Sequence, residues 1–414
     1  MTNLTDEPTA IATYIHGAPR LLAGTTGDRR VDHTLHLSLH GDPVLRRRSW
    51  LTDALRGARL LGRGGAAFPV ATKLEAVPSS ATTQVLVNGS ESEPASFKDR
   101  TLMTSVPHLV LDGALVVAHA LGTHHVTVVV HDSDAVDSLQ RAIRERSDAS
   151  GVRVVHTHGG FVGGEIRAAI SGLNGAIARP PGRRVLPHVA GIAGRPTFAS
   201  NVETFAQIAL LARLGPVDFM RTGSNAEPGT VLLTMLGDVR QPGVVEVPLG
   251  IPIATLLPRE PGPVLLGGYH GSWVRDVDGL PLERGALAAV GATLGAGVIV
   301  RPPTGTCPVE DVVRVARWLA DQSTGQCGPC FFGLPASADD LESLAHGGGL
   351  ERLTALRRRL GLVTGRGACA HPDGAARFVG SALDAMAENF QAHAIHGDCG
   401  RAHSHVLPIP GAAS

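Results

Sequence analysis

Strands and helices alternate in the first half of the chain, and this alternation restricts the fold more than any other feature of the sequence. The runs QVLVN (84–88) and HVTVVVH (125–131) are rich in β-branched residues and suit buried strands, and RVVHTH (153–158) follows as a third strand. Between them we expect one helix over 107–122 and another over about 134–147. Because short connections separate these elements, the pattern is typical of a layered sheet of parallel strands covered by helices. The sequence therefore predicts an α/β fold.

Along the rest of the chain, the pattern of expected secondary structure changes twice. Two short strands around a turn are expected in TVLLTMLGDVRQPGVVEVPLG (230–250), which indicates a small mixed β domain, and from Pro308 onward the pattern is helical. The N-terminal residues lack strong periodicity. We therefore place an α/β domain at 49–225, a β domain at 226–303 and a helical domain at 304–400, between an irregular N-terminal segment (1–48) and a loose tail (401–414).

Charge and hydropathy exclude several classes of protein. The 37 Lys+Arg residues balance 37 Asp+Glu residues, which argues against the basic face that nucleic-acid binding needs. No stretch reaches the roughly 18 consecutive apolar residues of a membrane-spanning helix, and the polar, acidic N-terminus has no signal-peptide pattern. We therefore expect a cytoplasmic protein that binds no nucleic acid and has no membrane span of its own.

Lysine is rare in this chain. Lys73 and Lys98 are its two lysines, and both lie within residues 62–100, whereas every other Lys+Arg position is arginine. The planar guanidinium of arginine does not replace a compact ammonium where space and point charge matter. The position of both lysines therefore points to a site in this segment.

Two loops in the α/β region carry the features of a ligand site. GRGGAAFPVATK (62–73) has a run of small residues after Arg63, so its backbone could wrap closely around a ligand and offer N–H groups to it, although it matches no nucleotide-binding motif. VNGSESEPASFKDR (87–100) carries an asparagine and two glutamates directly after a predicted strand, where open α/β sheets bind ligands. A tight loop in the first case and a surface ion pair in the second are the alternative interpretations.

Two further loops show the same arrangement. GGFVGGE (159–165) follows a strand and ends in Glu165, and PTFASNVET (196–204) leads into a helix whose N-terminus suits a phosphate group. Ser200 or Asn201 is expected to cap that helix. Neither loop is specific on its own, because capped helices are common.

All five cysteines lie in the last quarter of the chain, and they form no disulfide framework. The run STGQCGPC places Cys327 and Cys330 around a turn, and Cys369 follows about forty residues later. Such a turn directs two thiolates at one centre, as iron–sulfur clusters and zinc require, but three thiolates are one short of a full set. Cys307 and Cys399 are expected to be inert small hydrophobes or surface thiols, and nearly all of the 19 histidines to face solvent.

Taken in order, these blocks resemble a known family. Over about residues 50–390 the chain is similar to the NADH-binding flavoprotein subunit of respiratory complex I. The similarity lies in the order of the blocks GRGGAAFP, NGSESEPASFKDR, GGE, GRPTFASNVET, a small β domain and a CxxC with a late cysteine. They resemble the related subunits of NAD-linked hydrogenases and formate dehydrogenases as well. NGSESEP also resembles, less completely, a loop in the peripheral subunit of the ion-pumping ferredoxin:NAD oxidoreductase.

The resemblance implies a fold, cofactors and partners. The fold would be a layered Rossmann-like FMN domain, followed by a β-grasp (soluble-ligand-binding) domain and a C-terminal helical bundle that binds an iron–sulfur cluster. The implied reaction transfers a hydride from NADH to FMN, and then single electrons to a [4Fe–4S]-type cluster. The implied acceptors are partner redox subunits of a ferredoxin-like or complex I-type kind, peripheral to a membrane complex.

The resemblance also implies which residues bind the flavin. Lys73 is expected to face its phosphate or ribityl oxygens, and Lys98 to brace its own loop through Asp99 or Glu93. The implied FMN-binding residues are Gly62, Arg63, Gly64, Gly65, Phe68, Lys73, Asn88, Glu91, Ser92, Asn201 and Thr204.

Several positions depart from the family pattern. Glu93 and Glu165 are the implied catalytic carboxylates, but Ile166 replaces a second glutamate and Ser90 replaces an aspartate. Several of the departing positions contact NADH in the family, so the sequence supports FMN binding better than NADH binding. The other departures are Ala67, Ala76, Arg183, Leu186 and Ser200.

The cluster motif departs as well, because Thr324 stands where the family has a cysteine. The implied ligands that remain are Cys327, Cys330 and Cys369, and a hydroxyl is a much poorer ligand for iron than a thiolate. Three outcomes are open: a three-iron cluster or one with a non-cysteine fourth ligand; a fourth ligand from Cys307, Cys399 or a nearby histidine; or no cluster.

Three functions follow from these observations. The chain is an electron-input flavoprotein that oxidises NADH, or a relay that keeps flavin or cluster but takes electrons from a partner, or a scaffold whose β domain binds a ligand or partner. Ile166, Ala76 and Leu186 favour the relay, and Thr324 and Ser90 favour the scaffold.

Overall fold

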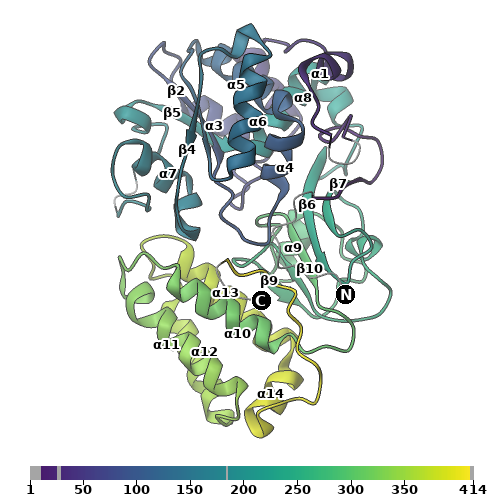
Figure 1. Cartoon of the computed structure of the whole chain (residues 1–414), viewed down its shortest axis with the longest axis vertical. Helices are drawn as coiled ribbons and strands as arrows, with labels where there is room; N and C mark the ends of the chain where they lie inside the picture. The colour runs from purple at the N-terminus through teal and green to yellow at the C-terminus, as the bar shows by residue number, and fades with distance from the viewer. Residues whose placement is uncertain (1–10, 26–28, 183–184, 411–414) are drawn as a thin grey trace.

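The computed structural model describes residues 11–25, 29–182 and 185–410. Two sheets and a set of C-terminal helices make up the described chain (Figure 1). Arg183, which departs from the family pattern, and the last four residues of the predicted tail lie outside the described residues. The predicted α/β fold class is confirmed by the parallel sheet described next.

The first sheet has four parallel strands with helices on both faces (Figure 1). Val85 and Val87 pack into the cluster formed with α5 and α8, whereas Leu86 points the other way, towards α7. Alternation of side chains along a strand explains how these uninterrupted apolar runs bury both faces. The elements are β2 (Gln84–Gly89), β3 (Val126–Val130), β4 (Val152–His156) and β5 (Thr197–Asn201), with α5 (Pro107–Leu121), α6 (Ser133–Arg144), α7 (Ile166–Leu173) and α8 (Val202–Phe219).

Helices α5 and α8 cross at a glycine. A Cβ atom on Gly113 of α5 would lie 1.9 Å from the carbonyl oxygen of Phe205 in α8, so only glycine permits this contact. The other helices before the C-terminal region include α2 (Arg48–Gly57), α3 (Val70–Ala76), α4 (Lys98–Ser105) and α9 (Arg284–Ala289).

The second sheet has six strands in the order β1-β7-β6-β10-β8-β9 and is mixed. Its central hairpin of β6 and β7 is antiparallel, as predicted, and β10 runs parallel to β6. Five strands lie inside the β domain that we propose at 226–303. The strands are β6 (Thr230–Gly237), β7 (Gly243–Pro248), β8 (Val264–Leu266), β9 (Ser272–Val274), β10 (Val298–Arg301) and β1 (Thr13–Ile15).

The prediction of an irregular segment over 1–48 is wrong for its described part. Strand β1 pairs in parallel with β7, and α1 (His33–His40) begins at Asp32, whose side chain accepts a hydrogen bond from the N–H of Leu35. A three-residue strand is too short to show a periodicity. The buried face of α1 carries His36 and His40 rather than apolar residues, so hydropathy conceals this helix.

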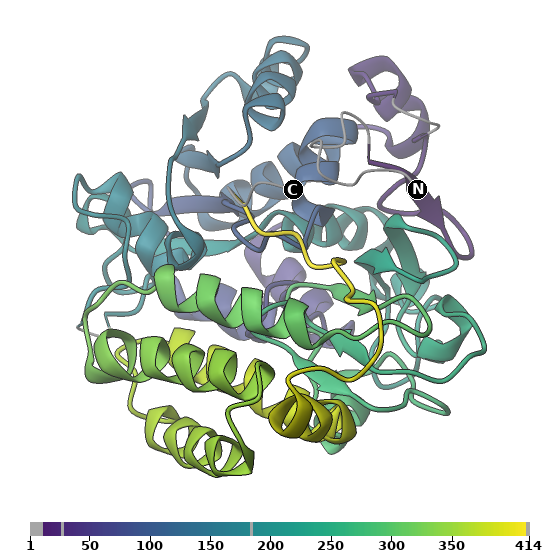
Figure 2. The same cartoon turned by 60° about the horizontal axis from the view of Figure 1, so that its bottom comes forward.

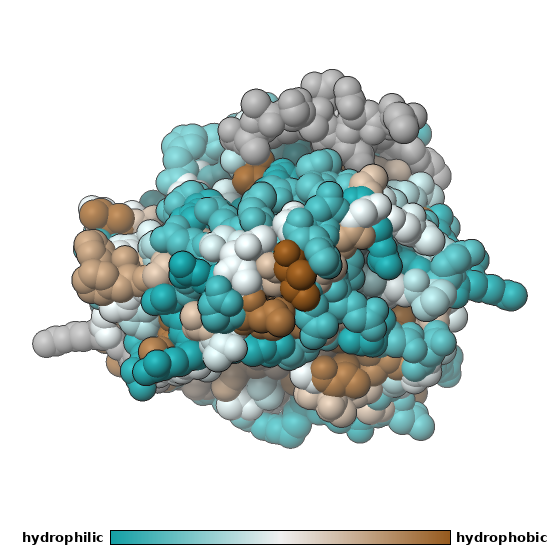
Figure 3. Space-filling model, turned by 90° about the horizontal axis from the view of Figure 1, so that it is seen from below, coloured by the Kyte–Doolittle hydropathy of each residue, from teal (hydrophilic) through white to brown (hydrophobic). Residues whose placement is uncertain are grey.

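Five helices form the C-terminal region (Figure 1), which has its own apolar core. Gly349 precedes α12. Met386 separates α13 from α14, whereas the sequence pattern over these two helices predicts one continuous helix. The helices are α10 (Val309–Asp321), α11 (Leu334–Ala345), α12 (Leu350–Val363), α13 (His371–Ala385) and α14 (Ala387–His396). Figure 3 shows that the face made by this region is mainly hydrophilic, with separate hydrophobic patches.

The tail is not loose over residues 401–410. It leaves α14 and runs back across the molecule (Figure 2). Its backbone forms a parallel bridge between His403 and Cys307, the side chain of Leu407 is buried, and the hydroxyl of Tyr269 donates to the segment at 2.5 Å. The prediction failed because these contacts come from residues about one hundred positions away in sequence.

The length and hydropathy of the helices bear on membrane insertion within the described residues. There, no single helix is long and apolar enough to cross a membrane, although α4 and α5, bent by 96° where they meet, pass the test together by length and composition.

Candidate functional site

The chain reverses direction at the edge of the parallel sheet where β2 and β5 end. From β2 the chain builds outward through β3 and β4, and then returns to add β5 on the other side of β2. Asn88 and Asn201, the polar residues near the two strand ends, are paired in register. In open α/β sheets the crevice at such a reversal is where ligands bind. The fold therefore brings the second and fourth predicted loops to one point.

The Gly-rich loop joins the same edge. The N–H of Arg63 donates to the hydroxyl oxygen of Thr204 at 2.8 Å, and the N–H of Gly62 donates to the carbonyl of Phe68 at 3.0 Å. The first bond fixes the loop to the start of α8, and the second closes the loop on itself. The side chain of Phe68 is 48% exposed, so it is free to contact a ligand.

Gly64 and Gly65 have no role that the folded chain itself explains. Neither has a positive φ. A Cβ atom on Gly64 would lie no closer than 3.9 Å to Asn201, and one on Gly65 no closer than 4.0 Å to Gly295. Because ordinary contacts begin at such distances, the fold alone would accept side chains here. A flat ligand lying against the loop does require glycine, so the loop fits the isoalloxazine or phosphate of a flavin.

Lys73 supplies a positive charge beside this loop. Its Nζ donates to the carbonyl of Ala199 at 2.8 Å, and the described residues offer it no carboxylate partner. Burial lowers the pKa of Lys73 to about 8, so the ammonium is still charged at neutral pH. A buried ammonium without a counter-ion suits a phosphate, as the resemblance implies.

The third loop is tied to the second. The side-chain amide of Asn88 donates to the carbonyl of Gly164 at 2.8 Å, and the hydroxyl of Ser92 donates to the carbonyl of Phe161 at 2.7 Å. Both bonds hold the GGFVGGE loop against the end of β2. All four predicted loops therefore meet at one edge, which the sequence could place only by analogy.

Two of the predicted flavin-binding side chains are used inside the protein. The carboxylate of Glu91 accepts hydrogen bonds from the N–H of Asp99 (3.1 Å) and of Arg100 (2.8 Å), so it caps α4. The guanidinium of Arg63 donates to the carbonyl of Thr230 in the second sheet at 3.1 Å. Both side chains thus hold the surrounding backbone in place.

A buried group of charges lies beneath the loops. The ammonium of Lys98 is 2.9 Å from carboxylate oxygens of both Asp99 and Glu203. Burial alone would lower the pKa of Lys98, but the two carboxylates outweigh it and raise the pKa. The predicted brace from Lys98 to Asp99 is therefore present.

The predicted N-cap position of α8 is confirmed, but the capping hydrogen bond comes from another part of the chain. Asn201 is the N-cap residue, but its side chain makes no capping bond and instead accepts from Thr204 and donates to Asp99. The carboxylate of Asp99 accepts a hydrogen bond from the N–H of Glu203 at 3.1 Å. Asp99 therefore caps the N-terminus of α8, although it lies about one hundred residues earlier in the sequence. Sequence motifs for capping cover neighbours only, so they could not reveal this contact.

The two predicted catalytic carboxylates occupy different surroundings. Glu93 is buried, and its carboxylate accepts from the N–H of Tyr269, in the turn between β8 and β9 of the second sheet, at 2.9 Å. Burial raises the pKa of Glu93 to about 7. Glu165 is half-buried and pairs with Arg167 at 2.5 Å. Glu165 is therefore the more accessible of the two carboxylates.

The predicted cluster ligands lie at the end of α10. Burial and the neighbouring thiol of Cys327 raise the pKa of Cys330 to about 12, and the charge of Cys369 acts in the same direction. The N–H of Thr324 hydrogen-bonds to the sulfur of Cys330 and opposes the shift. Cys327 and Cys369 therefore lie near enough to Cys330 to affect its pKa, and we propose that the three thiols take three positions of one four-iron cluster.

Cys307 and Cys399 do not supply the fourth position. His371, two residues after Cys369, donates from its Nε2 to the carbonyl of Leu319 near the end of α10, at 2.8 Å. Cys307 precedes the start of that helix, and twelve helical residues span about 18 Å. The sulfur of Cys307 therefore lies far from the three thiols, and Cys399 lies beside Cys307.

An aromatic contact connects the flavin edge to the cluster region. The ring of Phe161, from the GGFVGGE loop, lies 5.2 Å from that of Trp318 and 5.8 Å from that of His371. The N–H of Phe161 also donates to the side chain of Gln322 at 3.0 Å. The loop that borders the proposed flavin site thus packs directly on the helices that carry the cysteines.

The expectation that histidines face solvent and that the spare cysteines are inert needs correction. His36, His108, His371 and His393 are buried. Cys307, His393 and Cys399 lie together, with their ligand atoms within 4.8 Å of one another. The six-residue spacing of His393 and Cys399 was the available signal, but it matches no common metal motif.

The fold and these donor sets define a flavin-binding, iron–sulfur class of electron-transfer protein, and comparison with known proteins agrees. Residues 55–210 match the Nuo51 FMN-binding domain, and residues 311–393 match the NADH-ubiquinone oxidoreductase-F iron-sulfur binding region. The chain belongs to the family of NADH-quinone oxidoreductase F subunits, as the sequence motifs predicted.

Individual relatives show the extent of the similarity. An NADH-quinone oxidoreductase F subunit of Rhizobium meliloti is 30% identical over 374 residues, which cover 83% of this chain and 88% of the relative. The F subunit of the Mycobacterium tuberculosis enzyme is 32% identical over 380 residues, 83% of this chain and 84% of the relative. Among solved structures, an NAD+-reducing [NiFe]-hydrogenase in the H2-reduced state superimposes with a TM-score of 0.78 at 26% identity, covering 92% of this chain and 67% of that chain.

Proposed function

We propose that this chain is an electron-input subunit that oxidises NADH, holds FMN at the edge between β2 and β5, and delivers electrons through an iron–sulfur cluster to partner redox subunits. The observation that carries the proposal is the glycine loop, because Gly64 and Gly65 are explained by a flat ligand and not by the fold. Family membership supplies the identity of that ligand. When bound, FMN accepts a hydride and releases electrons singly.

The residues of this chain hold and orient that cofactor. Lys73 neutralises a phosphate, and the backbone of the loop at Gly64 and Gly65 lies against the ligand. Asn88 and Asn201 keep the two strand ends and the adjoining loops in place through bonds to Gly164 and Asp99.

Glu165 is the carboxylate that we place beside the nicotinamide. It is partly exposed at the start of α7, and its pair with Arg167 fixes its orientation. Glu93, in contrast, is tied to the N–H of Tyr269, so we assign it a positioning role at the junction of the two sheets.

The cluster, as we propose it, has three protein thiolates. Cys327, Cys330 and Cys369 hold three irons, and Thr324 or solvent faces the fourth position. Oxygen ligation at one iron gives a cluster with a labile corner, because iron–sulfur cores prefer thiolates. Loss of one iron would leave a three-iron cluster on the same ligands.

The partner subunit is expected to bind beside the cluster. Phe331 and Phe332 follow Cys330 directly, and their side chains are 64% and 70% exposed. The two rings pack against each other at 4.8 Å between centroids. Two exposed aromatic residues next to a cluster ligand suit a protein interface, because aromatics are enriched in the centres of such interfaces.

A relay function is the second candidate, and one observation favours it. Where the resemblance implies two adjacent glutamates, this chain has Glu165 followed by Ile166, whose side chain packs on the sheet face that carries Leu86 and Ala199. A carboxylate that the family uses is therefore replaced by a residue that packs against a core. A relay would keep FMN and the cluster but receive electrons from another subunit.

Turnover by the isolated chain separates the two functions. The purified, FMN-loaded chain is mixed with NADH and ferricyanide, and reduction of ferricyanide is followed optically. We expect catalytic turnover that is lost in Glu165→Gln and retained in the exposed control Glu260→Gln. Bound FMN that millimolar NADH never reduces would contradict NADH oxidation and leave the relay.

A second test addresses the flavin site itself. Gly64→Val places a branched side chain where the proposed ligand lies, and no atom of the folded chain stands closer than 3.9 Å to the new Cβ. We expect loss of bound FMN with an unchanged thermal transition of the flavin-free protein. Full FMN content in this variant would place the flavin elsewhere.

A further inference from the structure

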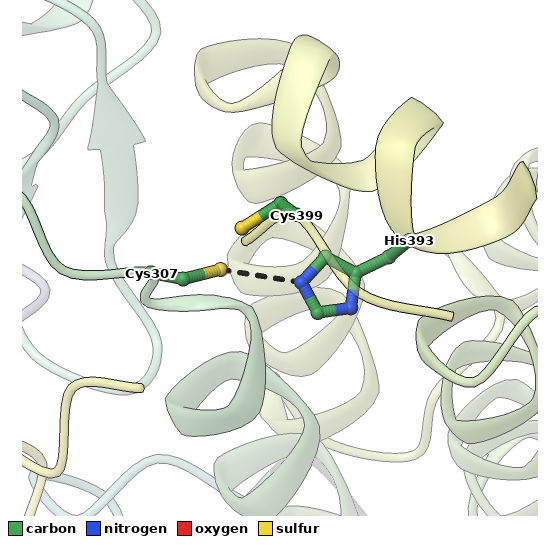
Figure 4. A group of neighbouring side chains, drawn as sticks. All are labelled: Cys307, His393 and Cys399. Atoms are coloured by element: carbon green, nitrogen blue, oxygen red, sulfur yellow. Dashed lines mark hydrogen bonds between the residues drawn. The ribbon is translucent and has the colours of Figure 1, made fainter. Parts of the chain in front are cut away.

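A second group of metal-ligand side chains lies at the opposite end of α10 from the cluster motif. Cys307 precedes α10, His393 is in the last turn of α14, and Cys399 follows that helix. Their ligand atoms, two sulfurs and one nitrogen, all lie within 4.8 Å of one another. Figure 4 shows the three side chains converging from three separate segments.

The imidazole of His393 has the tautomer that a metal ligand needs. Its Nδ1 lies 2.8 Å from the carbonyl oxygen of Ala345, which can only accept, so Nδ1 carries the proton. Its Nε2 therefore presents a lone pair, and this atom is 3.4 Å from the sulfur of Cys307. Metal-ligating histidines usually donate their other N–H to a carbonyl or carboxylate in this way.

The distance between Cys307 and His393 is that expected in a tetrahedral site. Zinc–sulfur bonds of about 2.3 Å and zinc–nitrogen bonds of about 2.0 Å at a tetrahedral angle separate sulfur and nitrogen by about 3.5 Å. The observed 3.4 Å between Cys307 and His393 is close to this value. These two ligand atoms thus need little movement to accept an ion, and the sulfur of Cys399 lies within 4.8 Å of both.

A side chain outside the three also supports thiolates. The amide nitrogen of Asn389 lies 3.8 Å from both the sulfur of Cys307 and the sulfur of Cys399. An amide N–H stabilises negative charge on sulfur, and hydrogen bonds of this kind orient the ligands of metal sites. Neutral apolar cysteines, which the sequence predicted, would not need a shared donor.

We propose that Cys307, His393 and Cys399 bind a zinc ion that is separate from the iron–sulfur cluster. Two cysteines and one histidine form a soft donor set that suits zinc in a tetrahedral site. His403, whose ring centroid is 6.3 Å from that of His393, is the side chain that we assign to the fourth position. On binding, each thiol releases one proton to solvent, and the metal is not oxidised or reduced.

The position of the site indicates its role. The backbone of Cys307 pairs with the tail at His403, and the tail continues past Asp311, whose carboxylate accepts from the N–H of Val406 at 3.2 Å. A zinc ion would join the tail, α14 and the start of α10. It therefore acts as a structural clamp, and it does not depend on the proposed flavin chemistry.

Metal content tests the proposal directly. The full chain is purified anaerobically, incubated with zinc, desalted and analysed for zinc and iron. We expect one zinc per chain in the wild type, and loss of zinc but unchanged iron in Cys399→Ser and His393→Gln. The matched variant Cys369→Ser should lose iron and keep zinc. Replacement of zinc by Co2+ should give the visible absorption of a tetrahedral thiolate-bound ion.

Four results would overturn the proposal. They are a wild-type chain that retains no zinc after desalting, a mass two daltons lower that reports a Cys307–Cys399 disulfide, zinc that survives Cys399→Ser together with His393→Gln, or zinc that is lost from Cys369→Ser alone. Because the wild-type measurement needs no variant, misfolding of a variant cannot obscure the outcome. Trypsin cleavage after the exposed Arg401, expected to rise when zinc is removed, reports the clamp independently.

Discussion

Lys73 is the single residue whose charge matters most to the proposed flavin site. Its ammonium is buried without a carboxylate partner among the described residues, and a charge-assisted hydrogen bond to phosphate contributes about 1.5–3 kcal/mol. Lys73→Met should therefore weaken FMN binding by about 10- to 100-fold, measured by fluorescence titration of the flavin-free chain. Lys73→Arg, which keeps the charge, is the matched control and should lose less. Equal affinity in Lys73→Met and wild type would show that this side chain does not contact the phosphate.

The lowered pKa of Lys73 also leads us to expect that FMN binding depends on pH. Burial lowers the pKa of Lys73 to about 8 in the folded chain, so the ammonium is charged below pH 8 and loses its proton above it. Binding of FMN should therefore be strongest below pH 8 and weaken as the pH rises through 8. Burial of the charged ammonium also lowers the free energy of unfolding. This loss of stability is largest below pH 8 and disappears as the pH approaches 10.5, where the unfolded chain also loses the proton. Titrations across this range should show the dependence in wild type and none in Lys73→Met.

Replacement of Lys98 is expected to lower the stability of the folded chain. Lys98 lies between Asp99 and Glu203 and is buried with them. Lys98→Met removes the ion-pair partner of Asp99 and leaves Glu203 only the more distant guanidinium of Arg63, at 3.8 Å. Removing one partner of a buried ion pair costs about 3–5 kcal/mol. Denaturant unfolding should show this loss, whereas Arg221→Met, which removes the exposed pair with Asp218, should cost less than about 1 kcal/mol. A change in Lys98→Met as small as in the control would contradict a buried pair.

Single residues show why part of the site was predictable and part was not. Asn88 and Asn201 follow strands, and strand ends are visible in a sequence, so their convergence could be expected. Arg63 and Glu91 were expected to face the flavin, but Arg63 donates to Thr230 and Glu91 caps α4. A charged residue in a loop motif gives no sign of which way its side chain points, because the partner lies in a distant element.

At the level of elements, the contact between α5 and α8 depends on Gly113. A Cβ atom there would lie 1.9 Å from the backbone of Phe205, which cannot move without separating the helices. Gly113→Ala should therefore destabilise the chain by more than about 2 kcal/mol, as overpacking of a core does. Gly361→Ala in α12 is the control, because a Cβ there meets nothing within 4 Å and alanine favours helix by about 1 kcal/mol. Thermal unfolding should move down in the first variant and slightly up in the second.

The elements that sequence patterns predicted are those with apolar periodicity. Strands β2, β3 and β4 and helix α5 lie within one to three residues of their predicted bounds. Strand β5 was expected as a loop because TFASN mixes small and polar residues, yet it is held by pairing with β2. Pairing partners, not local pattern, decide such strands.

For the whole molecule, Glu93 joins the α/β region to the second sheet. Its pKa is raised by burial from 4.5 to about 7, so the folded chain binds this proton more tightly than the unfolded chain does. Its contribution to stability is therefore greatest below pH 4.5 and falls as the pH rises to 7. Glu93→Gln can still accept from the N–H of Tyr269 but cannot ionise. The difference in melting temperature between variant and wild type should grow in favour of the variant from pH 4.5 to 7.

The arrangement of the parts was predictable only through the family resemblance. The reversal of strand order that brings four loops together depends on where β5 is added, and periodicity does not reveal this. The return of the tail to Cys307 and the gathering of His393 with Cys399 depend on helix packing over about one hundred residues. The family resemblance implies the arrangement of the loops around β5, but it does not imply the return of the tail or the gathering of His393 with Cys399.

The most direct test of the central claim is an anaerobic absorbance spectrum of the purified chain, with flavin and iron determined on the same sample, before and after addition of NADH. The structure predicts one FMN per chain whose absorbance is bleached by NADH. A colourless chain that takes up no added FMN would contradict the claim.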